Sequence, residues 1–87
     1  MTTISNISIT TDGTEPPADI EVTVTCDISN NEGDTPQAFF PAHAMGTDMT
    51  NSSGNTWTAS DKQMYDDEKK LITIMCDDAE ASATFTP

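Results

Sequence analysis

Two cysteines are the residues of this chain best suited to covalent chemistry. Cys26 and Cys76 lie far apart in the sequence, each in a segment where apolar and polar residues alternate. Alternation with a period of two predicts a strand with one buried face, and both cysteines fall in the buried phase. We therefore expect them to face each other between two sheets, either as a disulfide or as two buried thiols. A disulfide would stabilise the fold by about 4 kcal/mol in the chain-entropy model.

Carboxylates dominate the charged side chains. The chain has fifteen Asp and Glu residues against three Lys, and its formal net charge is −12. This charge excludes binding to nucleic acid or anionic lipid through a basic patch. It leaves cations, basic proteins and neutral glycans as partners, and it also keeps a small domain soluble.

Calcium is the cation that these carboxylates favour. Ca²⁺ requires several oxygen ligands, and the loops at one end of a β-sandwich can supply them. The first candidate ligands are Asp66, Asp67 and Asp77, which lie in two polar turns. No turn matches the D-x-[DN]-x-[DN]-G pattern of a calcium loop, so the alternative is a solvated acidic rim. We expect no other cofactor.

Catalysis receives little support from the sequence. His43 is the single histidine, and no Ser, His and Asp arrangement can be identified around it. A CxxC motif and a glycine-rich phosphate loop are both missing from the sequence. We therefore expect a domain that is not an enzyme.

The elements that position these residues are short strands. The cysteine-bearing strands are expected over 19–28 and 70–77, with others near 4–9, 37–40, 56–60 and 81–86. Clusters rich in Gly, Pro, Asn and Asp separate them, and 61–69 reads as a polar connection between sheets. This pattern predicts a single all-β domain, an immunoglobulin-like two-sheet antiparallel β-sandwich of about seven strands. The expected core includes Phe40, Trp57, Ile74 and Phe85.

Several large side chains have no evident inward phase. They include Met64 and Tyr65, whereas Leu71 and Met75 lie on the face of their strand opposite Cys76. Together they predict an exposed face that binds another protein, because methionines suit adaptable contacts. The alternative is that the connection over 61–69 covers the outer side of the second cysteine strand.

The last third of the chain resembles a known family. The segments Gly54-Asn55-Thr56-Trp57-Thr58-Ala59, Leu71-Ile72-Thr73-Ile74 and Ala79 through Pro87 resemble the closing half of bacterial immunoglobulin-like (Big-type) domains. Similar domains occur in tail, head and fibre proteins of bacteriophages. The chain departs from the family pattern in lacking a Gly-Asn turn before the last strand, and in carrying a cysteine pair that most members lack.

The resemblance implies an accessory domain that decorates a virion, on a bacteriophage capsid or tail, and contacts another protein or the host surface. The alternative is a recognition or spacer module from a larger bacterial surface or secreted protein. Such a module would bind glycan or protein through loops such as 47–55. No segment approaches the ~20 apolar residues of a membrane span, so no membrane insertion is expected. Residues 1–6 do not read as a secretory signal, and we expect a virion or extracellular location.

Overall fold

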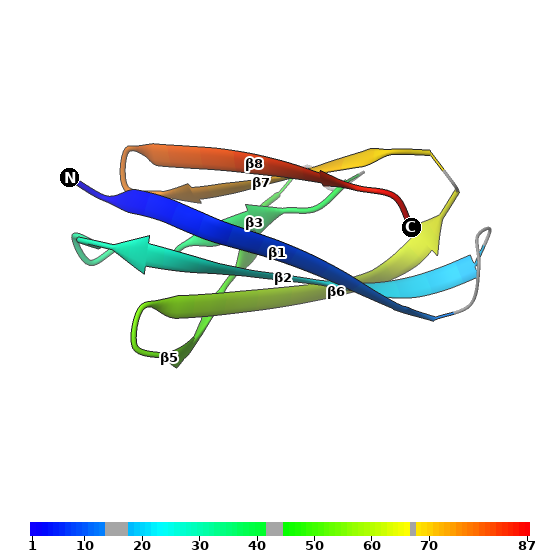
Figure 1. Ribbon diagram of the computed structural model, residues 1–87, viewed down its shortest axis with the longest axis horizontal. Coiled ribbons are helices and arrows are strands. Elements are labelled where there is room, and N and C mark those ends of the chain that lie inside the picture. Colours follow the sequence, from blue (N-terminus) through cyan, green and yellow to red (C-terminus); the bar gives the residue numbers. More distant parts are fainter. Residues whose placement is uncertain (14–17, 42–44, 67) are drawn as a thin grey trace.

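The computed structural model describes residues 1–13, 18–41, 45–66 and 68–87, which form eight strands and no helix (Figure 1). The strands are β1 (Thr3–Gly13), β2 (Ala18–Ser29), β3 (Gln37–Phe39), β4 (Thr47–Asp48), β5 (Thr50–Ser53), β6 (Thr56–Tyr65), β7 (Lys70–Cys76) and β8 (Ala79–Phe85). None of the described segments is a helix of the length and apolarity needed to cross a membrane.

The strands form two four-stranded sheets that pack face to face (Figure 1). One sheet has the order β1-β2-β6-β5 and the other β4-β3-β7-β8, and every neighbouring pair is antiparallel. The first order is the A-B-E-D order of an immunoglobulin sandwich, and β3-β7-β8 corresponds to C-F-G. The predicted two-sheet, immunoglobulin-like sandwich is therefore confirmed.

The core lies between β2 and β7, as their alternation requires. The inward residues of β2 are Ile20, Val22, Val24, Cys26 and Ile28, and those of β7 are Ile72, Ile74 and Cys76; all eight are buried. Phe40 is buried among them, whereas Trp57 and Phe85 are only partly buried and pack against the edge of the core. Burying these side chains supplies most of the favourable free energy of folding.

β6 extends further than the sequence pattern predicts. The segment 61–65 was expected to belong to a connection, but it continues the strand as far as Tyr65. The reason is β2, whose long N-terminal half offers backbone partners: Asp61 lies opposite Val22 and Tyr65 opposite Ala18. This pairing turns Tyr65 inward, where it is 3% exposed and packs edge to face on Phe85, with ring centroids 5.8 Å apart.

The two cysteines are buried but not bonded, so the disulfide alternative is wrong for this structure. The Cys76 thiol accepts a hydrogen bond from Asn31 Nδ2 at 3.4 Å and donates one to the carbonyl oxygen of Asp34 at 3.8 Å. Burial, then the charges of Asp27 and Cys76, raise the pKa of Cys26 to about 11. Burial also raises the pKa of Cys76. Both groups are therefore poor nucleophiles near neutral pH.

We expect the folded protein to resist alkylation. At pH 8 both thiols should react with iodoacetamide on the order of a hundredfold more slowly than an exposed cysteine, because burial limits access and suppresses the thiolate. After unfolding in urea, intact-mass analysis should show one adduct on each cysteine. An unfolded chain that takes up no adduct and lacks two hydrogens would instead contain a disulfide.

Candidate binding sites at the loop end of the sandwich

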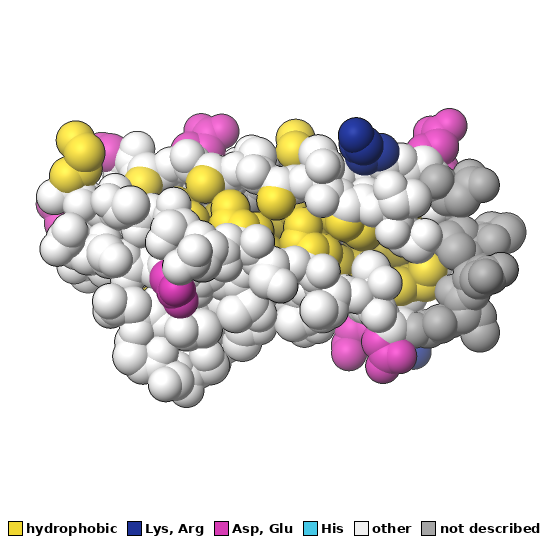
Figure 2. Space-filling model, viewed as in Figure 1, with side chains coloured by type: hydrophobic (Ala, Val, Ile, Leu, Met, Phe, Trp, Pro, Cys, Tyr) yellow, Lys and Arg dark blue, Asp and Glu magenta, His cyan; other side chains and the backbone are white. Residues whose placement is uncertain are grey.

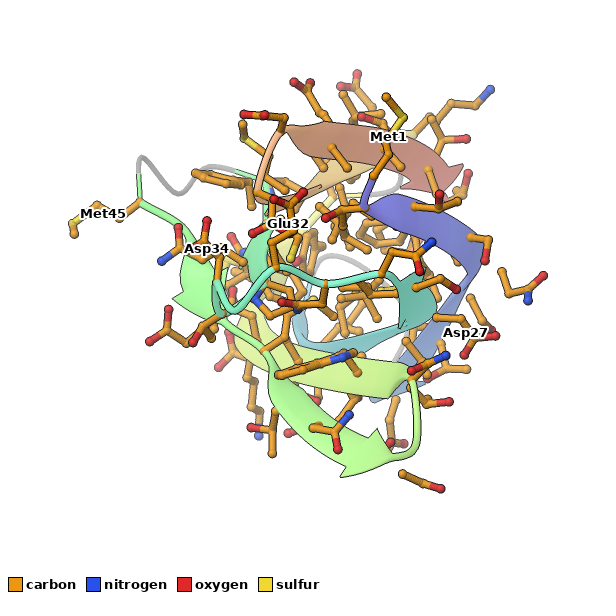
Figure 3. The ribbon with its side chains drawn as sticks, turned by 90° about the vertical axis from the view of Figure 1, so that its left-hand side faces the viewer. Met1, Asp27, Glu32, Asp34 and Met45 are labelled. Carbon is orange, nitrogen blue, oxygen red and sulfur yellow. The ribbon has the colours of Figure 1, made fainter. Side chains whose placement is uncertain are left out.

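Segments that are distant in the sequence meet at one end of the sandwich, which we call the loop end. It comprises the N-terminal residues 1–2, the loop 30–36 after β2, the turn 54–55 and the turn 77–78. Figure 3 looks onto this end, where Met1, Glu32 and Asp34 project around the loop after β2. A backbone hydrogen bond joins the end of β2 to the turn 54–55: the N–H of Ile28 donates to the carbonyl oxygen of Asn55 at 2.8 Å.

Asp77 is the polar centre of the loop end. Its carboxylate accepts hydrogen bonds from the Thr2 hydroxyl and from the backbone N–H of Glu32, the latter at 2.9 Å. The Thr2 hydroxyl also lies 3.1 Å from the carbonyl oxygen of Asn30. The two hydrogen bonds to the carboxylate, first that from Thr2 and then that from Glu32, hold the pKa of Asp77 below its ordinary value. Asp77 thus joins the N-terminus, the loop after β2 and the β7–β8 turn.

Asp34 lies beside Asp77, and its pKa is shifted in the opposite direction. A side-chain hydrogen bond to Asp77 and the negative charge of that residue raise the pKa of Asp34, and the charge of Asp78 adds to the effect. Two neighbouring carboxyl groups cannot both ionise at low cost, so one keeps its proton to a higher pH. Because Asp77 has the better hydrogen-bond donors, Asp34 is the member of the pair that protonates first as pH falls.

The predicted calcium ligands do not come together. Asp66 precedes β7 and Asp77 follows it, so the length of the strand, about 20 Å, separates them. Asp66 instead pairs with Lys70 Nζ at 2.6 Å. Asp67 lies outside the described residues, as does His43. No group of three or more His, Cys, Asp or Glu side chains in the described ranges is placed to hold a metal ion. The prediction of a site at Asp66 and Asp77 is therefore wrong.

The predicted protein-binding face is divided among three environments. Tyr65 is buried, so it cannot belong to an exposed face, and that prediction is wrong. Leu71 and Met75 are exposed on the outer side of β7, but Met64 projects from β6 in the other sheet, opposite Asp19. The four residues therefore form no single surface. Sequence reasoning could not separate them because it placed 61–69 in a loop.

Met75 does border a shallow hollow at the loop end. This hollow has a volume of about 370 Å³, and its apolar lining comes from Phe39 and Met75. Asp34 and Asp77 stand on its rim. It is open to solvent and acidic on one side.

A larger hollow, also open to solvent, lies between the loop after β2 and the β5–β6 turn. We call it the amide cavity; its volume is about 600 Å³, within the range of small-molecule sites. Its lining includes four of the five asparagines in the chain: Asn30, Asn31, Asn51 and Asn55. Trp57 and Ile28 contribute apolar side chains to the lining, and Asp34 contributes a carboxyl group. The loop 47–55 was predicted as a binding loop, but Asn30 and Asn31 were not, because only the sandwich topology shows that the two loops meet.

Searches against protein-family models, curated proteins and solved structures found no match for this chain. The fold is thus established by strand order and register, and the functional argument depends on the surfaces of the molecule itself.

Proposed function

We propose that this chain is a non-enzymatic, immunoglobulin-like accessory domain that attaches to a larger protein assembly along one side of its sandwich. That side, which we call the open side, is the band between β1 and β8. Partly buried apolar residues of both strands line it: Ile4, Ile7 and Ile9 of β1, and Ala81, Ala83 and Phe85 of β8. Figure 2 shows hydrophobic side chains exposed there in a diagonal band across the middle of the molecule. This band is the observation that carries the proposal.

The open side exists because small residues face the core from β8. Ala81 lies opposite Ile74 and Ala83 opposite Ile72, so both point inward, but their methyl groups cover little of the core. β1 and β8 also end their respective sheets, and no hydrogen-bonded ladder joins them. Each therefore leaves a row of backbone N–H and C=O groups without a partner among the strands of the described ranges. An exposed apolar band beside two unpaired edges is typical of an interaction site.

The occupant that fits is an extended strand of another protein. A strand added at the edge of β8 would pair with its free backbone groups, and every second side chain would cover the apolar band. The domain carries a net charge of −12, which favours a partner whose polar positions are Lys or Arg. We therefore propose a partner strand with alternating apolar and basic residues.

A virion is the assembly that we propose. Support comes from the resemblance of the last third of the chain to the immunoglobulin-like domains found in bacteriophage head, tail and fibre proteins. The non-enzymatic role is supported by Cys26 and Cys76, whose burial and raised pKa values make them poor nucleophiles.

The test uses a pair of matched substitutions on β8. Ala83→Lys places a charge on the inward side of an edge strand, whereas Thr84→Lys adds the same charge on the exposed outer side. The readout is the fraction of each chain that co-sediments with particles purified from its native source. We expect Ala83→Lys to lower this fraction by about tenfold or more, and Thr84→Lys to leave it nearly unchanged.

Thermal unfolding of each variant, followed by circular dichroism, checks that the sandwich is intact. Equal losses for the two variants would show that the open side is not the attachment surface. Wild-type chain that sediments as a free monomer in the presence of the particles would reject the proposal as a whole.

A further inference from the structure

We propose that the amide cavity is a binding site for a neutral saccharide. This site lies at the loop end, and it does not depend on attachment through the open side. The four asparagines that line it differ in their hydrogen bonding. Two of them are occupied in holding the loops, and two are free to bind a ligand.

The occupied pair shapes the walls of the cavity. Asn31 Nδ2 donates to the carbonyl oxygen of Asp34 at 3.1 Å, and Asn31 Oδ1 accepts from the N–H of Gly33 at 2.6 Å. Asn51 Nδ2 donates to the carbonyl oxygens of Gly54 and Thr56, at 2.9 and 3.1 Å. These bonds fix one loop on each side of the cavity. A site with walls held in this way loses little entropy when a ligand binds.

The free pair comes from the two loops that border the cavity. Asn30 comes from the loop after β2 and Asn55 from the β5–β6 turn, and both are exposed. Within the described part of the chain, neither side-chain amide has a hydrogen-bond partner. Each offers a carbonyl acceptor and an NH₂ donor to a ligand. Asn30 has a φ of 57°, a conformation that asparagine tolerates better than most residues.

Trp57 adds the apolar contact that a sugar requires. Its side chain is partly exposed and lines the same cavity. One face of a pyranose ring carries polarised C–H bonds, and the electron-rich face of an indole attracts them. The hydroxyls of that ring both donate and accept, which matches the dual character of a side-chain amide. An aromatic side chain that lines the same cavity as two free amides is therefore suited to a saccharide.

The charge of the cavity selects a neutral ligand. The two free side-chain amides are uncharged, and the Asp34 carboxyl, which also lines the cavity, belongs to a domain of net charge −12. An anionic sugar would meet this charge without a Lys or Arg among the cavity-lining residues to pair with it. We therefore expect uncharged hexoses or N-acetylhexosamines to bind, and sialylated or phosphorylated sugars to be rejected.

Trp57 also reports on the site, because it is the single tryptophan of the chain. We would titrate the full chain with cellobiose, maltose, lactose and N,N′-diacetylchitobiose, with sialyllactose as the anionic comparison, and follow tryptophan emission. For the disaccharide that binds best, ¹⁵N-resolved NMR would map the perturbed side-chain amides. We expect shifts at Asn30 and Asn55, and saturable emission changes with neutral sugars only.

Three variants test the assignment. Asn55→Ala and Asn30→Asp each remove a free amide, and the aspartate retains tolerance of positive φ; we expect each to weaken binding by about tenfold. Met64→Ala, an exposed change on the other half of β6, should leave the affinity unchanged. Ala83→Lys should also bind sugar normally, so a failure of docking and a failure of saccharide binding are distinguishable.

The proposal is overturned if no sugar of the panel changes the emission at tens of millimolar. It is equally overturned if sialyllactose binds as tightly as lactose, or if the NMR shifts lie outside the amide cavity. Full affinity in both asparagine variants would assign any observed binding to another surface.

Discussion

Replacing Ile74 with alanine is expected to lower the free energy of unfolding by about 2–5 kcal/mol. Ile74 is 0% exposed at the centre of β7. Its cross-strand neighbours in register are the small residues Ala38 on β3 and Ala81 on β8, which cannot fill the space left behind. A domain of this size has only about 5–15 kcal/mol of stability in total. Urea unfolding followed by Trp57 fluorescence and far-ultraviolet circular dichroism would measure the loss.

The matched control is Leu71→Ala on the same strand. Leu71 is 53% exposed on the outer side of β7, so the substitution removes similar atoms without opening a cavity. We expect it to cost less than about 1 kcal/mol. If both variants lost a similar free energy of unfolding, Ile74 could not be the side chain of β7 that points into the core, and the packing of the two sheets would be contradicted.

Asp77→Ala is expected to lower the midpoint of thermal unfolding by about 5–10 °C at pH 7. The substitution removes the acceptor for the Thr2 hydroxyl and for the N–H of Glu32, which is left without this partner. It also places alanine at a φ of 53°, where aspartate and asparagine are better tolerated. Asp78→Ala, an exposed change in the same turn, is the control and should shift the midpoint by no more than a few degrees.

The effect of Asp77 should depend on pH in a defined direction. Its pKa is lowered in the folded state, so ionised Asp77 stabilises the fold above the ordinary pKa of aspartate. That contribution is lost as pH falls through the lowered folded-state pKa. Scanning calorimetry of wild type and Asp77→Ala from pH 7 to strongly acidic solution should therefore show the difference between their midpoints shrinking. A constant difference would show that backbone strain alone causes the loss.

Asp34 affects the pH dependence of stability in the opposite direction. Its pKa is raised in the folded state, so its ionisation costs stability as pH rises through that value. The two carboxyl groups thus partly cancel in the pH profile of the wild-type protein. For this reason the comparison with the Asp77 variant is more informative than the profile of wild type alone.

The parts of the fold that alternate strictly were predictable from sequence. β2 and β7 carry a β-branched residue or a cysteine at every second position from Ile20 and from Ile72 onward, and their period determines which side chains are buried. β6 was predicted only to Ser60, because Asp61 and Gln63 occupy inward positions beyond it and obscure the pattern. Its final residues become strand because β2 offers backbone partners there. Pairing with a distant strand is not encoded in local periodicity.

The loop end was less predictable than the core. Asp66 and Asp77 were both correctly placed near turns, but the two turns flank the same strand and so lie at opposite ends of the molecule. Conversely, Asn30 and Asn55 are 25 positions apart and meet across one cavity. Knowing that β2 and β6 are antiparallel neighbours is enough to bring these two residues together. The composition of either loop alone gives no such signal.

The two chain ends lie toward opposite ends of the molecule, so the terminus used for immobilisation determines which end of the protein faces the solution. Met1 lies at the loop end, whereas Pro87 lies toward the opposite end of a body 39 Å long (Figure 1). A tether or fluorophore joined after Pro87 would leave the amide cavity facing away from the support. The same group joined before Met1 would lie beside Thr2, Glu32 and Asp78, at the loop end itself. Immobilising the protein in both orientations would therefore show which of its surfaces a soluble ligand requires.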